Sequence, residues 1–260
     1  MLSVVIPSYK DPLLQNTIQS LLGNAQGNIE IIAVLDGYWP DTPMINDERV
    51  KYLHLGKNTG MRRAINAGIA IAKGEYIMRT DEHCAFGPGF DVILTRDIEP
   101  GWIVTPRRYF LDPVKWELMD IPPVDHMKLK IVNVEDGVQK FSGVEAPGDE
   151  NQTVQESMAM QGSCWVMKRT WWDEVIGELQ NEGYGPHYQD SHEMVFKTWK
   201  AGGKLMVNKN TWHAHKHRSF PRTHNNGTKE NPSNNKSCWE YSLSVWRDYY
   251  EKEIKPKWGI

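Results

Sequence analysis

The sequence contains little of what marks a secreted or membrane-embedded protein. Its three cysteines, Cys84, Cys164 and Cys238, are far apart and form no CxxC pair, which argues against a disulfide framework and favours a reducing compartment. No run reaches the roughly 18 consecutive apolar residues that a membrane-spanning helix needs. Met1 leads directly into the strand-like LSVVIP, without the charged and apolar regions of a signal peptide. We therefore expect a cytoplasmic protein with no membrane span.

A large excess of one charge is also missing. The formal net charge is -3 and the pI is about 6.3, which argues against general electrostatic binding to nucleic acid or anionic membranes. No internal repeat is visible. What is present is a composition of 40% hydrophobic and 24% charged residues over 260 positions, which is enough to bury the core of one domain.

Apolar runs rich in β-branched residues alternate with helical patterns in the N-terminal part. The runs are LSVVIP, IEIIAVLD, KYLHL and EYIMRTD. Between them, residues 12–23 and 61–73 have helical character, the second with Ile65, Ile69 and Ala72 on one face. This alternation predicts an α/β protein, with a mainly parallel, Rossmann-like sheet flanked by helices and with ligands at the carboxyl ends of its strands.

The regular pattern stops and then returns in the second half. Residues 106–160 are rich in Pro, Gly and acidic residues, and we expect them to form inserted surface loops with one hairpin that shape a substrate cleft. A strand-to-helix pattern follows, then the helix HYQDSHEMVFKTWKAGG and a strand leading into TWHAHKHR. We expect a single domain over residues 1–220, followed by a loop and a C-terminal helix over residues 221–260.

The predicted strands end in polar residues. Because the carboxyl ends of parallel strands meet at one edge of a sheet, these residues are expected to converge from distant parts of the chain. They are, in chain order, Pro7, Ser8 and Tyr9 after the first strand, Asp36 and Gly37 after the second, and Asp81, Glu82 and His83 after the fourth.

A further polar group opens the second predicted helix. Asn58, Thr59 and Gly60 precede it, and Arg62 and Arg63 lie in its first turn. A guanidinium beside a helix N-terminus suits a diphosphate, and a nearby carboxylate suits the edge of a nucleobase. Ordinary exposed helix charges are the alternative interpretation of the two arginines.

Two histidine-containing motifs indicate a metal site. Asp81 and His83 form a D-x-H pattern in which the first and third residues point the same way, although a capped turn with a surface histidine is the alternative. His213, His215 and His217 alternate in WHAHKHR, which places them on one face of a strand. One of these imidazoles, together with Asp81 and His83, would give a mixed nitrogen and oxygen site suited to Mn²⁺ or Mg²⁺.

Together these segments resemble GT-A nucleotide-sugar glycosyltransferases over residues 2–90 and 161–218. SVVIPSYKD resembles the opening strand of glycosyltransferase family 2, and NTGMRRAINAGIAIAKGEYIMRTD resembles its segment running into the metal motif. The polypeptide N-acetylgalactosaminyltransferase family is also similar. Its D-S-H motif is matched by Asp81-Glu82-His83, and its E-N-L-E helix ending in F-R-x-W-x-x-G-G by DSHEMVFKTWKAGG, with Lys197 in place of arginine.

The resemblance implies a GT-A hexosyl- or N-acetylhexosaminyltransferase that uses a UDP-sugar and Mn²⁺. By an ungapped count from Gly203, the third metal ligand after Asp81 and His83 is His215, with His213 in reserve. The metal would neutralise the diphosphate leaving group. The residues expected to hold the donor are Pro7, Ser8, Tyr9, Asp36, Asn58, Gly60, Arg63, Asp81 and Glu82, among which Asp36 would contact the uracil.

The resemblance also bears on stereochemistry. Inverting family 2 enzymes carry a catalytic aspartate on the helix before the G-G pair, and this position is Ser191 here, which cannot act as a base at neutral pH. We therefore predict retention, with Asp190 and Glu193 positioning the sugar hydroxyls or the acceptor. A shift of one residue would make Asp190 the base of an inverting enzyme.

Other interpretations remain open at this point. A metal-dependent hydrolase or nucleotidyltransferase could use the same acids, and a non-catalytic GT-A domain could bind sugar or nucleotide only. The acceptor could be a protein hydroxyl, a glycan or small metabolite, or a modified nucleic-acid base. The Asn-rich tract of residues 224–236 suggests either a lid over the bound UDP-sugar or a plain surface loop.

Overall fold

The computed structural model describes residues 1–134, 137–217 and 232–260, with side chains in the last range from Lys236 onward. The strands are β1 (Leu2–Ser8), β2 (Ile29–Asp36), β3 (Val50–Leu55), β4 (Tyr76–Thr80), β5 (Cys84–Phe86), β6 (Trp102–Asp112), β7 (Glu117–Leu118), β8 (His126–Asn133), β9 (Gln139–Ala146), β10 (Val154–Glu156), β11 (Cys164–Lys168) and β12 (Lys204–His215). The helices are α1 (Leu14–Asn24), α2 (Met61–Ile71), α3 (Phe90–Thr95), α4 (Arg169–Trp171), η2 (Trp172–Ile176), α5 (Asp190–Lys200), α6 (Pro232–Tyr249), η3 (Tyr250–Ile254) and α7 (Lys255–Lys257), of which η2 and η3 are π-helical.

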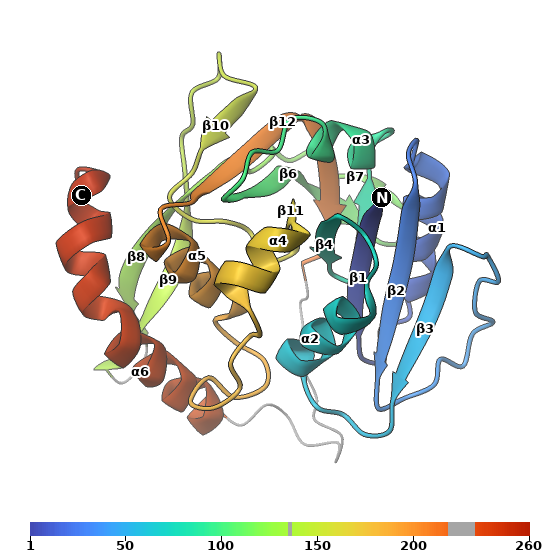
Figure 1. Cartoon of the computed structure of the whole chain (residues 1–260), viewed down its shortest axis with the longest axis horizontal. Helices are drawn as coiled ribbons and strands as arrows, with labels where there is room; N and C mark the ends of the chain where they lie inside the picture. The colour runs from blue at the N-terminus through green and yellow to red at the C-terminus, as the bar shows by residue number, and fades with distance from the viewer. Residues whose placement is uncertain (135–136, 218–231) are drawn as a thin grey trace.

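One large sheet runs through the molecule in the order β10-β12-β6-β11-β4-β1-β2-β3 (Figure 1). β1 is parallel to β2 and β4, and β2 is parallel to β3. In the other half, β11 runs antiparallel to both β4 and β6, whereas β12 is parallel to β6. The predicted α/β class is confirmed. The parallel half is the one whose strands alternate with α1 and α2, since helical crossovers return the chain in the same direction.

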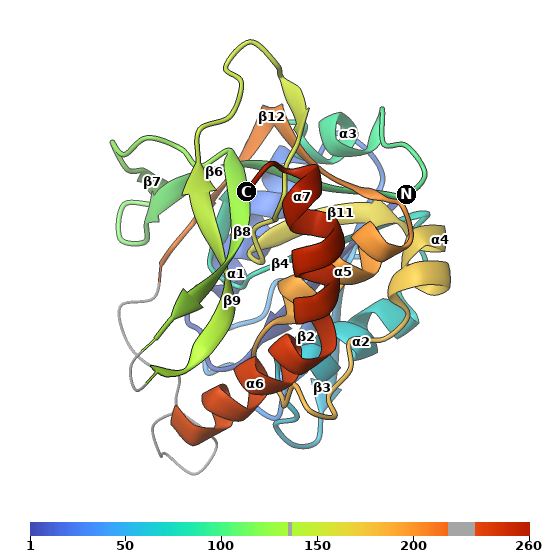
Figure 2. The ribbon, with the colours of Figure 1, turned by 90° about the vertical axis from the view of Figure 1, so that its left-hand side faces the viewer.

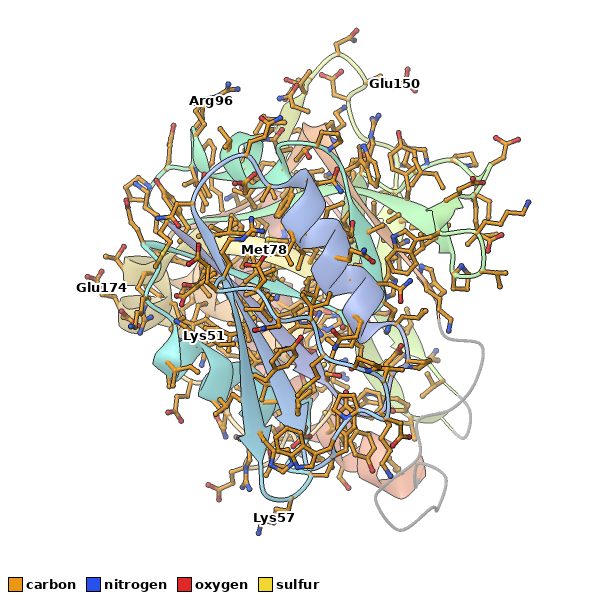
Figure 3. The ribbon with its side chains drawn as sticks, turned by 90° about the vertical axis from the view of Figure 1, so that its right-hand side faces the viewer. Lys51, Lys57, Met78, Arg96, Glu150 and Glu174 are labelled. Atoms are coloured by element: carbon orange, nitrogen blue, oxygen red, sulfur yellow. The ribbon has the colours of Figure 1, made fainter. Side chains whose placement is uncertain are left out.

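The central strands are buried because helices cover both faces of the sheet. Along β1, Val4 packs with Leu14 and Ile18 of α1. Its neighbour Val5 packs on the opposite face with Ile65 of α2. This two-sided burial explains why β1 and β2 are continuous apolar runs. Figure 3 shows Met78 in the interior on β4 and Lys57 at the outer tip of the turn after β3.

The inserted range 106–160 contains more regular structure than the expected loops with one hairpin. The hairpin is formed by β8 and β9, which pair from His126 with Ala146 to Asn133 with Gln139. The second half of β6 and the strands β7 and β10 add further pairing. Burial of Leu129 and Phe141 fixes the hairpin against the rest of the core.

The C-terminal helix closes this core. Trp246 of α6 stacks on Phe196 of α5 with ring centroids 5.1 Å apart, and Tyr250 contacts Phe141 of β9. The Tyr250 hydroxyl also donates to the backbone oxygen of Leu129, at 2.9 Å. Figure 2 shows α6 and α7 lying across α5 beside the β8–β9 hairpin. α6 and η3 together therefore fix the inserted hairpin to α5.

Two expectations from composition can be compared with the structure. The thiols of Cys84, Cys164 and Cys238, for which no disulfide framework was expected, are free and buried. In the described part of the chain, none of the helices combines the length and apolar character needed to cross a membrane. Residues 224–231 of the Asn-rich tract lie outside the described residues and residues 232–236 belong to the start of α6, so the lid stays a prediction.

Candidate functional site

Asp81, His83 and His215 come together at the carboxyl end of β4. The antiparallel pairing of β5 with β12 sets His215 opposite Cys84, next to His83. The Nε2 atoms of His83 and His215 are 3.1 Å apart, and the Nε2 atom of His215 is 3.1 Å from a carboxylate oxygen of Asp81. One ligand atom from each residue lies within 4.8 Å of the other two. The sequence-predicted triad is thus assembled in space.

Two charged neighbours, Arg79 and Asp11, influence the triad: one affects the charge of Asp81 and the other the orientation of His83. Burial by itself raises the pKa of Asp81, but the nearby Arg79 and His215 outweigh it and hold that pKa well below its usual value. Asp11 lies 3.0 Å from Nδ1 of His83 and leaves Nε2 facing the triad. A carboxylate behind a ligating histidine fixes the tautomer and orientation of the ring.

The donor set fits a divalent cation such as Mn²⁺. It offers one carboxylate oxygen and two imidazole nitrogens, which is a mixed set rather than the thiolate or closed four-ligand set of structural zinc. Burial lowers the pKa of His215, which keeps the imidazole neutral and its lone pair available to a metal. Asp81, His83 and His215 would therefore hold the ion.

The reserve candidate His213 has a different partner. It is fully buried, and its Nε2 atom lies 2.9 Å from the Ser163 hydroxyl. His217 lies edge-on to the ring of His215, with centroids 4.9 Å apart. Of the three alternating histidines, only His215 contributes to the triad.

A cavity of about 390 Å³ adjoins the triad. Its wall includes Asp81 and His215, Asp190 and Ser191 from the first turn of α5, and Arg108 of β6. Asp190 is 8% exposed, and its carboxylate forms no hydrogen bond or ion pair with any residue that the structure describes. A carboxylate in such a position is available to bind a hydroxyl or to accept a proton.

Glu193 does not line this cavity, in contrast to the expected contact with sugar or acceptor. It is 1% exposed and forms ion pairs with Arg62 of α2 and with Lys197, the second at 2.8 Å. Arg62 also donates to the backbone oxygens of Gln180 and Tyr188 at 2.8 and 2.7 Å. The pair joins α2 to α5 in the interior, because a charge buried there requires a partner.

The Asp36 carboxylate accepts hydrogen bonds from the turn before α2. One carboxylate oxygen accepts from the backbone N–H and hydroxyl of Thr59, at 2.7 and 3.0 Å, and the other from Asn58 and the N–H of Gly60, at 2.9 and 2.8 Å. Gly60 has φ of +92°, and an added Cβ would meet Pro186 at 2.3 Å. The Asp36 carboxylate therefore builds this turn, and its predicted contact with uracil stays a prediction.

The remaining predicted donor residues lie around the end of β1. The hydroxyl of Ser8 is hydrogen-bonded to that of Tyr38, and Glu82 accepts from the N–H of Tyr9 at 2.8 Å. Pro7 is buried within β1. Arg63, in contrast, is exposed on α2 and is not among the residues of the cavity wall. The strand tips converge as predicted, whereas the arginine does not join them.

Sequence reasoning missed Asp11, Arg79 and Arg108. Arg79 is a charged residue inside the buried strand β4, and Arg108 lies on β6. A charge within an apolar strand signals a partner or a ligand, so Arg79 was visible in principle. Asp11 has no such signal, because only the tertiary fold brings it to His83.

Comparison with known proteins identifies relatives of the chain. The family model of glycosyl transferase family 2 matches residues 3–175. Glycosyltransferase GlyG of Streptococcus pneumoniae is 39% identical over 88 residues, which are 31% of this chain and 29% of that protein. A protein named Uncharacterized glycosyltransferase EpsJ, from Bacillus subtilis, is 34% identical over 84 residues, or 30% and 24% of the two chains. The chain spans less than a third of the length of these curated relatives.

A solved structure shares the fold over nearly the whole chain. The crystal structure of GalNAc-T7 with UDP, GalNAc and Mn²⁺ superposes with a TM-score of 0.70 at 18% identity, covering 98% of this chain and 50% of that one. The GT-A fold expected from the sequence is confirmed by this likeness.

Proposed function

The chain belongs to glycosyl transferase family 2, and from that premise we propose that it transfers a sugar from a UDP-sugar to an acceptor hydroxyl with the help of Mn²⁺ or a similar ion. The assembled triad of Asp81, His83 and His215 is the observation that carries this proposal. When bound, the ion supplies positive charge against the departing diphosphate.

The residues of the chain hold the ion and the donor. Asp81 keeps its charge beside Arg79, and Asp11 orients His83. The strand tips around Ser8, Tyr38 and Glu82 offer the nucleotide a rigid edge, because their side chains are already hydrogen-bonded to one another and to the backbone. That GalNAc-T7 was solved with UDP, GalNAc and Mn²⁺ supports the choice of donor class and metal.

For stereochemistry we propose retention. Ser191 occupies the position where inverting relatives carry their base, and it lines the cavity without an acidic group of its own. Asp190 would then bond sugar hydroxyls or the acceptor. The phosphate oxygen that leaves with UDP would take the acceptor proton on the same face.

A second candidate is inversion with Asp190 as general base. The observation that favours it is the Asp190 carboxylate, which faces the cavity and has no hydrogen-bond or ion-pair partner among the described residues. A base in this position would take the proton of an acceptor hydroxyl that attacks from the side opposite the diphosphate.

The test is UDP release from a panel of UDP-sugars with Mn²⁺ and with EDTA. We expect release that needs the ion and is lost in His83→Ala. Release that persists in EDTA at the same rate would contradict the metal assignment. Proton NMR of the first-formed product from an α-linked donor then decides the stereochemistry, since an α-product indicates retention and a β-product indicates Asp190 as base.

The acceptor is proposed only as a class with a free hydroxyl. A protein, a glycan or small metabolite, and a modified nucleic-acid base all fit a cavity that is shaped on one side by the inserted hairpin residues Ser142 and Gly143. The reducing, cytoplasmic location likewise stays a prediction.

A further inference from the structure

Arg108 is a buried cation in the cavity wall whose hydrogen-bonding capacity is largely unused. It is 8% exposed, and its Nε atom is buried without a partner among the described residues. One Nη2 hydrogen bond to Glu145, at 3.0 Å, is the only one that its guanidinium makes to a described residue. A guanidinium has five N–H donors, so most of them remain available to a ligand.

The single partner of Arg108 is easily displaced. The Glu145 side chain is 61% exposed on β9, whereas that of Arg108 is 10% exposed. Glu145 can turn into solvent because its own side chain is largely exposed, provided that an incoming anion takes its place beside the buried cation. Arg108 cannot follow it, since its guanidinium lies 5.2 Å from the ring centroid of Phe110 and its backbone is bridged to Val124. The cation is therefore fixed, and its counter-ion is exchangeable.

Arg108 lies on the inserted side of the cavity whose wall also contains Asp81 and His215. Its hydrogen bond is to Glu145 of β9 and its guanidinium lies near Phe110 of β6, both in the inserted range, while its positive charge adds to burial in lowering the pKa of His215. The diphosphate is expected at the triad of Asp81, His83 and His215. A fixed guanidinium on the inserted wall is suited to bidentate binding of a carboxylate or phosphate on the reacting sugars.

We propose that Arg108 forms an anion subsite, and that one of the two substrates carries a carboxylate or phosphate group of its own in addition to the diphosphate. This inference rests on the proposed function and specifies its substrate class. The anion belongs either to the acceptor, as in a uronic acid or a sugar phosphate, or to the sugar of the donor, as in a UDP-uronate. In either case it displaces Glu145 from Arg108.

The test is equilibrium binding by calorimetry to the full chain. Two acceptor-type pairs, methyl glucuronide against methyl glucoside and glucose 6-phosphate against glucose, are titrated with UDP and Mn²⁺ at saturation. A donor pair, UDP-glucuronate against UDP-glucose, is titrated with Mn²⁺ alone. We expect the anionic member of at least one pair to bind about tenfold tighter, or about 1.4 kcal/mol. The pair that shows the preference identifies which substrate carries the anion.

Three variants separate recognition from a structural role. Arg108→Gln should remove the preference and leave UDP affinity unchanged. Glu145→Gln should strengthen anion binding about threefold, because it removes the competing carboxylate. Arg107→Gln is the matched control, since Arg107 is the next residue on β6 but pairs with Asp125 at 2.7 Å through two hydrogen bonds. This control should keep the preference.

Several results would overturn the subsite. They are the absence of a preference in all three pairs, an equal loss in Arg107→Gln, and a tenfold loss of UDP affinity in Arg108→Gln, which would assign Arg108 to the diphosphate. Failure of the proposed function can be told apart from failure of the subsite. In the first case the unmodified protein does not bind UDP in the presence of Mn²⁺. In that case the acceptor-type pairs are titrated into the protein alone. Loss of the anion preference in Arg108→Gln then still tests the subsite.

Discussion

The Nε2 atoms of His83 and His215 lie 3.1 Å apart although the two residues are separated by 132 positions in the chain. Two imidazole nitrogens that face each other at this distance, next to the Asp81 carboxylate, repel through their lone pairs unless a proton or a cation lies between them. The β5–β12 pairing holds them there. In the bare protein a proton on one of the two rings can fill this position, and a divalent ion would take its place.

His215→Ala should weaken Mn²⁺ binding more than about 100-fold, because removal of a ligand costs more than loss of an outer-shell partner. Calorimetric titration of Mn²⁺ in the presence of UDP measures this. His213→Ala is the matched control, since that ring bonds Ser163 rather than the triad. A larger loss of Mn²⁺ affinity in the control than in His215→Ala would show that the third ligand is His213.

Asp11→Asn should reduce Mn²⁺ affinity by about 10- to 100-fold without unfolding the protein. The amide can still bond Nδ1 of His83 but no longer supports the ring with a negative charge. The measurement is the Mn²⁺ concentration for half-maximal UDP release, with thermal unfolding as a control for the fold. An unchanged Mn²⁺ requirement would mean that Asp11 does not act through His83.

Asp36→Ala should lower the free energy of unfolding by about 3 kcal/mol, because four donors of the buried turn of residues 58–60 lose their acceptor. Urea denaturation measures this loss. A contact between Asp36 and the uracil, as the resemblance implies, would instead give a selective loss of UDP affinity with little change in stability. An unaltered urea midpoint together with weakened UDP binding would restore that interpretation.

Glu193→Gln should destabilise the fold by about 3–5 kcal/mol, because Arg62 is fully buried and would keep its charge without a counter-ion. Chemical denaturation provides the measurement. Glu174→Gln, at an exposed position of η2, is the control and should change stability little. If Glu193→Gln instead keeps its stability and loses transfer activity, Glu193 touches substrate after all.

Acidification should destabilise the protein partly through His192. Burial lowers its pKa to about 4, whereas an unfolded histidine titrates near 6.5. As the pH falls from about 6.5 to 4, the unfolded chain takes up a proton that the folded chain does not, so folding stability decreases. At pH 5 the contribution is about 2 kcal/mol.

The measurement is chemical denaturation of the unmodified protein and of His192→Asn at pH 7 and pH 5. The variant should lose about 2 kcal/mol less than the unmodified protein between the two values. Between pH 7 and pH 9 the two proteins should show no difference due to this residue, because His192 is neutral in both states. Equal losses on acidification would show that His192 titrates alike in both states.

Local patterns were sufficient for the secondary structure of the parallel half and for the choice of Asp81 and His83, whereas the choice of His215 among three alternating histidines came from the family resemblance. The apolar runs of β1, β2 and β4 and the helical period of α2 are properties of short windows, and the structure has these elements within a few residues of the predicted ranges. Asp81 and His83 are neighbours in the chain, and the strand alternation at His215 limits which face it occupies. These features depend on spacing, which a sequence displays directly.

Other features depend on which segments pack together, and they were decided only by the tertiary structure. Arg62 and Arg63 are equivalent in the sequence, but the position of α5 makes one a buried partner of Glu193 and leaves the other in solvent. The hydrophobic pattern of the inserted range does not by itself indicate β8 and β9. These strands are stabilised by contacts with α6 and η3, from the far end of the chain. Burial of a charge or of a weak hairpin is set by distant contacts, and no short window of sequence contains them.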